Sequence, residues 1–119
     1  MMNIVQFDTQ IPQHAAPCER PVIQMMVDLL LEDDGQVSIW DGEELVVSGS
    51  RNKAHILGNL SHTEMDQVEW YDKKGNTNGW FLLIYNNGSS SDGPMVVISD
   101  YCANDYCDGV YSKLSEVFD

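Results

Sequence analysis

Two apolar runs between residues 78 and 101 constrain the fold of this chain more than any other feature. They cover residues 80–85 and 95–98, and both are rich in aromatic and branched side chains. A polar stretch, residues 86–93, separates them, which predicts two adjacent strands joined by a loop. Both runs are nearly continuous rather than alternating. We therefore expect both faces of these strands to be covered and the pair to form the middle of a sheet.

Apolar side chains at helical spacing predict one helix on each side of the strand-forming region. The first covers residues 21–32, where Pro21 suits the first turn because its missing N–H would be unbonded there. Gly35 supplies its stop. The second is a C-terminal amphipathic helix over residues 110–118. A Ser-x-x-Glu spacing at residues 61–64 predicts a further short helical turn.

Shorter patterns predict the rest of an antiparallel sheet. Three further strands are expected over residues 37–40, 44–48 and 67–72. Asp41-Gly42 indicates a two-residue hairpin between the first two of them. No connection is long enough for parallel crossovers, so the strands should form a meander. The prediction is a single α+β domain over residues 1–119, in which the two helices flank a meander of about five strands and residues 1–20 are an extended N-terminal segment.

The charge balance limits the partners of the chain. Its 119 residues include 19 acids and 6 bases, for a net charge of −13. Such a surplus repels free nucleic acid and anionic membranes, so a partner should be basic. No stretch is apolar enough to span a membrane, and the N-terminus lacks the features of a signal peptide, which together favour a cytoplasmic protein. Its three cysteines, an odd count, favour free thiols over disulfides.

Chemical motifs are weak along the chain. Cys102 and Cys107 are spaced as C-x4-C, but no second ligand pair would complete a zinc site. The nearby acids, Asp105 and Asp108, lack the calcium-loop pattern and are more typical of acidic side chains at a helix start. The G-S-S-S-D-G segment at residues 88–93 lacks the lysine of a phosphate loop.

Three histidines could act as general bases, but no catalytic signature accompanies them. They are His14, His55 and His62. We therefore expect a protein that is not an enzyme and that needs no cofactor and no metal. A small enzyme or metal-binding protein that uses the loop from Cys102 to Asp108 is kept as an alternative.

Clustered acids give the sharpest functional hypothesis. Seven fall within residues 28–44, and those chosen as the contact face are Asp33, Asp34, Asp41, Glu43 and Glu44. Acids at the end of the first helix oppose its dipole and have no evident stabilising role there, which is the reason for choosing them. Dense carboxylates on one rigid face could imitate the charge of duplex DNA. The plainer interpretation is a solvated surface that only improves solubility.

The segment at residues 78–101, with its GWFLLIY…VVISDY pattern, resembles a motif in short acidic proteins of phages and bacterial mobile elements. It covers about a fifth of the chain, and it implies no activity and no functional residue. In size and acidity the chain is also similar in type to anti-CRISPR and anti-restriction inhibitors. The expected function is therefore an inhibitor that occupies the basic surface of a nucleic-acid-binding host-defence complex.

The alternative to an inhibitor is a generic interaction domain. Trp40, Trp70 or Trp80 would then lie at an interface, either with another protein or with a second copy as a homodimer. In that case the acidic surface would serve solubility alone.

Overall fold

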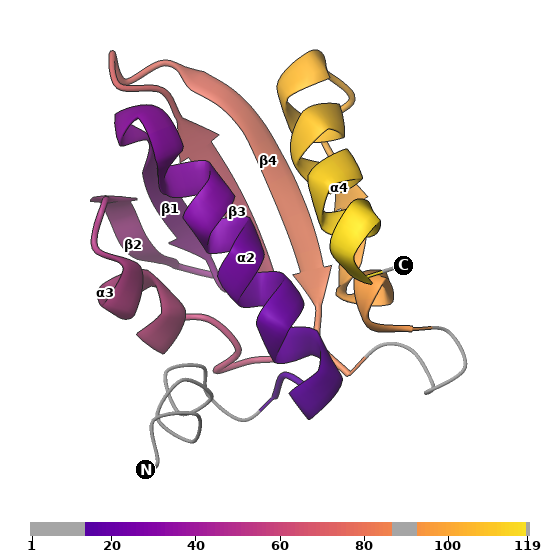
Figure 1. Ribbon diagram of the computed structural model, residues 1–119. Coiled ribbons are helices and arrows are strands. Elements are labelled where there is room, and N and C mark those ends of the chain that lie inside the picture. The colour runs from indigo at the N-terminus through magenta and orange to yellow at the C-terminus, as the bar shows by residue number, and fades with distance from the viewer. Residues whose placement is uncertain (1–13, 87–92, 119) are drawn as a thin grey trace, which may run out of the picture.

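A computed structural model describes residues 14–86 and 93–118, apart from the side chains of Asp33, Thr77 and Asn78 (Figure 1). The chain forms an α+β domain with a five-stranded antiparallel sheet in the order β2-β1-β3-β4-β5. Two long helices, α2 and α4, lie across one face of this sheet (Figure 1). The predicted fold class is confirmed. Most of the predicted N-terminal segment and of the loop at residues 86–93 lies outside the described residues.

The helices and strands follow one another with short connections. Their bounds are η1 Pro17–Glu19, α2 Arg20–Leu31, η2 Glu32–Asp34, β1 Gln36–Trp40, β2 Leu45–Ser50, α3 Lys53–Gly58, β3 Met65–Tyr71, β4 Thr77–Ile84, η3 Pro94–Val97, β5 Ile98–Tyr101 and α4 Asp105–Phe118. Strands β3, β4 and β5 form a meander. Strand β2 pairs outside β1, and α3 returns the chain so that β3 pairs with the other edge of β1. None of the described helices is long and apolar enough to cross a bilayer.

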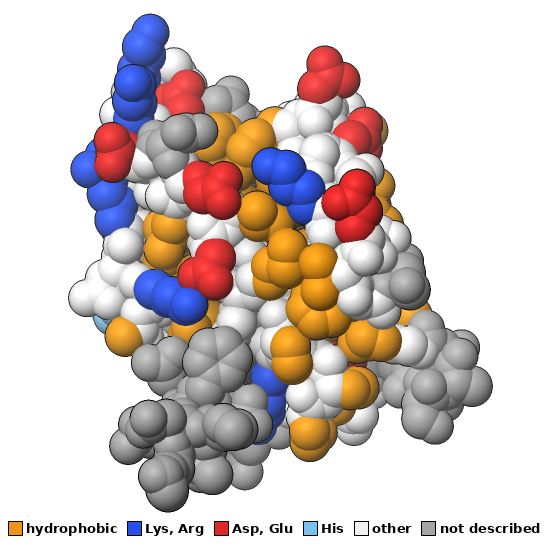
Figure 2. Space-filling view, viewed as in Figure 1, with side chains coloured by type: hydrophobic (Ala, Val, Ile, Leu, Met, Phe, Trp, Pro, Cys, Tyr) orange, Lys and Arg blue, Asp and Glu red, His pale blue; other side chains and the backbone are white. Residues whose placement is uncertain are grey.

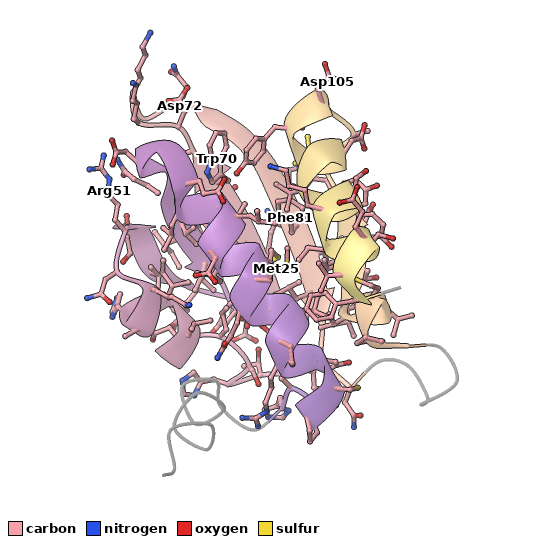
Figure 3. The ribbon with its side chains drawn as sticks, in the orientation of Figure 1. Met25, Arg51, Trp70, Asp72, Phe81 and Asp105 are labelled. Atoms are coloured by element: carbon pink, nitrogen blue, oxygen red, sulfur yellow. The ribbon has the colours of Figure 1, made fainter. Side chains whose placement is uncertain are left out.

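The core lies between the helices and the facing side of the sheet. Alternate residues of the strands point into it, and in Figure 3 Phe81 of β4 lies behind the seam between α2 and α4. The fully buried members include Ile23, Met26, Leu30, Ile39, Val68, Phe81, Leu83 and Leu114. Burying such side chains is the main favourable term in folding, and it fixes which face of each strand meets the helices.

The expected central strand pair is wrong in two respects. Residues 94–97 form the 3-10 helix η3, so β5 begins only at Ile98 and lies at the edge of the sheet. Gly93 has a left-handed φ of +82° and Pro94 begins the helix, a combination that favours a turn over an extended strand. Met95 and Val97 of η3 are buried in the core. Strand β3 takes the central place instead.

The second face of the sheet is also more open than its apolar runs predicted. Phe81 and Leu83 are fully buried, but Trp80, Leu82 and Ile84 alternate with them and are only half-buried. The described helices all lie on the other side (Figure 1). The continuous apolar run in β4 therefore supplies both a core face and a half-buried apolar face.

Two helix predictions were wrong because a side chain caps or redirects the backbone. Helix α4 begins at Asp105, five residues before the predicted start, because the Asn104 Oδ1 accepts a hydrogen bond from the Cys107 N–H at 2.8 Å. The helical turn predicted at residues 61–64 is absent. Ser61 instead has a φ of +69° and donates its N–H to the Asp66 Oδ2 at 2.8 Å.

The end of α2 also differs from the prediction. The residue in the left-handed conformation is Asp34, with a φ of +63°, whereas Gly35 has an ordinary φ of −63°. Aspartate tolerates the left-handed region better than most residues, so Asp34 has a structural role. Gly35 is needed for a different reason. A Cβ there would collide with the Leu30 carbonyl oxygen and with the Trp70 Nε1, which donates to that oxygen at 2.6 Å.

Candidate functional site

The hairpin between β1 and β2 is the most distinctive surface feature near the predicted contact residues. Its loop has four residues, 41–44, because Trp40 pairs with Leu45, so the predicted two-residue turn is wrong. The Asp41 Oδ1 accepts N–H groups of Glu44 at 2.9 Å and Glu43 at 3.0 Å. These bonds lower the pKa of Asp41, so its carboxylate stays charged while it shapes the loop.

Large hydrophobic side chains are exposed beside this loop. Trp40, Leu45 and Met65 are 40%, 44% and 39% exposed, and among the described residues only Val117 is a further large hydrophobic of this kind. Trp40 and Leu45 face each other across the hairpin. The Trp40 indole N–H donates to the Glu69 Oε1 at 3.0 Å, which holds the ring against the open sheet face. A cluster of this sort on a charged surface is a candidate interaction site.

Two adjoining hollows lie beside Trp40 and Met65. One, of about 380 Å³, lies on the open sheet face and is lined by Trp40, Met65 and Leu82. The other, of about 610 Å³, is lined by Asp41, Glu43 and Glu64. The two share Gly42 and Met65. We name the whole surface the hairpin patch, defined as Trp40, Leu45 and Met65 together with Asp41, Glu43, Glu44 and Glu64.

The structure divides the five predicted contact residues. Asp41, Glu43 and Glu44 lie together in the hairpin patch, whereas Asp34 precedes β1 at its opposite end. At about 3.3 Å per residue, the two ends of this five-residue strand are about 13 Å apart. The side chain of Asp33 is outside the description. The acids chosen from the sequence therefore do not form one continuous face.

Glu64 is the one carboxylate of the hairpin patch that was not chosen from the sequence. It is some twenty positions from the loop along the chain and reaches it only because β3 pairs with β1. Among the tryptophans proposed for an interface, Trp40 is exposed, Trp80 is half-buried and Trp70 is buried. In the sequence, Trp40 and Leu45 flank the segment that contains Asp41-Gly42, and this was the available signal for the apolar part of the hairpin patch.

Two of the three histidines considered as general bases lie beside the acidic hollow. His14 and His62 line the hollow, and the His62 Nε2 lies 2.7 Å from the Gly58 carbonyl oxygen. His55 lies on α3 and contacts Asn59 instead.

Two buried carboxylates, Glu19 and Asp66, have structural partners. The Glu19 Oε1 accepts the N–H groups of Ala16 at 2.9 Å and Asn86 at 2.8 Å. The Asp66 Oδ2 accepts the Ser61 N–H at 2.8 Å and the Tyr85 hydroxyl at 2.5 Å. Burial raises the pKa of Asp66, and the two hydrogen bonds oppose that rise. Both groups tie loops to the sheet and lie away from solvent.

The segment from Cys102 to Asp108, kept as an alternative enzyme or metal site, is mostly the start of α4. Cys107 is fully buried, and its sulfur occupies the space that a Cβ on Gly79 would fill. Burial raises the pKa of the Cys107 thiol to about 11. In the described ranges, no three histidine, cysteine or acidic side chains come together as metal ligands do.

Thiol reactivity should follow this burial. At neutral pH we expect Cys18, which is exposed, to react rapidly with a disulfide reagent such as Ellman's, because the thiolate is the reactive form. Cys107 should stay unmodified until the protein is unfolded in guanidinium chloride. Mass spectrometry of the labelled peptides with and without denaturant measures both rates. Fast labelling of Cys107 in the folded protein would contradict its burial between α4 and β4.

No protein family, curated protein or solved structure matches this chain. The hairpin patch is therefore the candidate site on the grounds of its exposed apolar side chains and its carboxylates.

Proposed function

We propose that the chain is a non-enzymatic acidic protein that binds a basic surface of a nucleic-acid-binding protein through the hairpin patch. In its most specific form, the protein inhibits a host-defence complex of the anti-CRISPR or anti-restriction type by blocking the surface that holds nucleic acid. The observation that carries this proposal is the pairing of exposed Trp40, Leu45 and Met65 with four carboxylates around two adjoining hollows.

The composition of the hairpin patch favours a protein partner. Protein interfaces typically have an apolar centre and a polar rim, and aromatic residues and methionine are enriched at the centre. Here four carboxylates supply the charge of the rim, so lysine and arginine side chains are the complementary groups. A nucleic acid would meet the same repulsion from the patch as from the whole chain, with its net charge of −13.

A basic partner is favoured over a second copy of this chain. A symmetric dimer through the hairpin patch would place the four carboxylates of one copy against those of the other, and like charges across an interface are destabilising. We expect sedimentation at low ionic strength to show a monomer. A dimer that persists at low salt and is lost in Leu45→Gln would support the self-associating alternative instead.

Reversal of charge in the hairpin patch tests the proposal. Purified RNA-guided nucleases and restriction complexes, each holding a fluorescent target duplex, are titrated with the wild-type chain. We expect the wild-type chain to displace the duplex from a susceptible complex. Added salt should weaken this displacement, because it screens the attraction between the carboxylates of the patch and the basic surface of the complex. The variant Glu43→Lys/Glu64→Lys should need at least about tenfold more protein, a change of about 1.4 kcal/mol in binding. Neither side chain makes a recorded hydrogen bond, so stability should be retained.

The matched control changes the same number of charges elsewhere. Asp100 on β5 and Glu116 on α4 are exposed and outside the hairpin patch, so Asp100→Lys/Glu116→Lys should displace the duplex as well as wild type. Equal loss in both variants would mean that overall charge alone drives binding. Failure of the wild type to displace a duplex from any of these complexes would contradict the inhibitor proposal.

A further inference from the structure

A groove on the helical face gathers much of the scarce positive charge of this protein. It lies where the end of α2, the β3–β4 turn and the first turns of α4 meet, and its volume is about 430 Å³. Figure 3 shows Trp70 at this end of the molecule, between α2 and α4, and Asp72 above it at the β3–β4 turn. In Figure 2, hydrophobic side chains appear along the seam between α2 and α4, with basic and acidic side chains around its upper end.

The floor of the groove is apolar and held in place. Trp70 and Tyr106 stack with ring centroids 3.8 Å apart and planes inclined by 16°. The Trp70 indole N–H donates to the Leu30 carbonyl oxygen at 2.6 Å, so its ring cannot turn without losing a buried hydrogen bond. Leu29 and Val110 complete the floor from the two helices. A rigid apolar floor of this kind suits a flat hydrophobic group, because little order must be gained on binding.

The rim of the groove is more positive than the rest of the surface. Lys73, Lys74 and Lys113 line it, three of the six basic residues of the chain. Among the described residues, the ion pair recorded is Lys53 with Asp28, outside the groove. Of the two acids in the lining, Asp72 uses its Oδ1 to accept the N–H groups of Lys74 and Asn76 and so orders the turn. Glu32 is the other acid.

We propose that this groove binds a small organic anion with a flat apolar body. The ring system would lie against Leu29, Tyr106 and Val110, and the sulfonate, carboxylate or phosphate group would be held by the lysines of the rim. Hydrogen bonds between ammonium groups and such anions are among the stronger ones. A volume of a few hundred cubic ångströms is typical of small-molecule sites. A long polyanion is disfavoured, because it would extend over the surface and be repelled by the net charge of −13. A small anion contacts only the groove, where the lysines lie.

The groove is independent of the proposed function. Its lining residues belong to the helical face and the β3–β4 turn, and it shares no residue with the hairpin patch. A ligand there could therefore be present or absent without any change in the surface proposed for the protein partner.

Naphthalene-2-sulfonate is a suitable probe, followed by isothermal titration calorimetry and by amide chemical shifts of the full chain. We expect saturable one-to-one binding, with the largest shifts at Lys74, Asn76, Tyr106 and Val110. Lys113→Gln should raise the Kd by about threefold or more, as expected when one charge-assisted contact is lost. The uncharged analogue 2-naphthalenemethanol should bind more weakly than the sulfonate to the wild-type protein.

Arg51→Gln is the matched control, because it removes one positive charge from an exposed position outside the groove (Figure 3). Its Kd should equal that of the wild type. An equal rise in Kd for both variants would overturn the proposal, since it would show attraction to overall charge only. Equal affinity for the uncharged analogue, or no shift in the groove at millimolar probe, would overturn it as well.

Discussion

Gly35→Ala is expected to lower the free energy of unfolding by about 2–4 kcal/mol, the sum of overpacking and of a lost buried hydrogen bond. The added methyl group would lie far inside van der Waals contact with the Leu30 carbonyl oxygen and the Trp70 Nε1. These two atoms form the hydrogen bond that joins the end of α2 to β3. Urea denaturation followed by tryptophan fluorescence measures the change.

Gly109→Ala provides the matched control for this prediction. The substitution adds the same methyl group inside α4, where nothing lies within 4 Å of the new Cβ. Alanine is favoured over glycine in a helix interior, so stability should rise by up to about 1 kcal/mol. If Gly35→Ala raised the free energy of unfolding as Gly109→Ala should, the close approach at the end of α2 would not be as tight as the structure shows.

Asp66→Ala is expected to destabilise the protein by about 2–5 kcal/mol, because it removes the buried carboxylate oxygen that accepts from the Tyr85 hydroxyl and the Ser61 N–H. Asp66→Asn keeps an oxygen that can accept both bonds, so its effect should be much smaller. Glu116→Ala removes an exposed acid of α4 and should change stability little. A loss in Asp66→Ala no larger than in Glu116→Ala would show that the buried bonds contribute nothing.

The pH dependence of Asp66→Asn should show the effect of burial. Since the pKa of Asp66 is raised in the folded state, the folded protein holds this proton more tightly than the unfolded chain. The contribution of Asp66 is therefore most favourable below its unfolded pKa of about 3.9 and is lost as the pH rises through the folded pKa. Relative to wild type, Asp66→Asn should gain stability between pH 4 and pH 7.

Asp41→Asn should show the opposite slope over the acidic range. Hydrogen bonds from the backbone of Glu44 and Glu43 lower the pKa of Asp41, so its contribution is present above the unfolded pKa and is lost as the pH falls. Urea unfolding of both variants and the wild type from pH 3 to pH 7 compares them. Parallel pH profiles for the two variants would contradict the different environments of these carboxylates.

Local patterns in the sequence were sufficient for the fold class. The 3.6-residue stripe of α2 and the apolar run of β4 were visible without a structure, because each reflects the burial of one element's own side chains. Errors arose where a single hydrogen bond or φ angle decided the outcome. Asn104 extends α4 toward the N-terminus, and Gly93 with Pro94 replaces a strand by η3.

The candidate site was only partly accessible from the sequence. Asp41, Glu43 and Glu44 are neighbours in the chain, so their proximity was predictable. Asp34 appeared close as well, but an extended strand separates it from the loop. Glu64 reaches the patch only through the pairing of β3 with β1.

The amino-acid sequence alone determined the surplus of negative charge, the two long helices and the apolar strand at residues 80–84, since these follow from composition and local periodicity. Only the tertiary structure decided which acids are buried, as with Glu19 and Asp66, and which meet at the hairpin patch. It also placed Lys73 and Lys74 next to Lys113. The physical reason is that strand register and helix packing are set by contacts between residues distant in the chain, which no local pattern encodes.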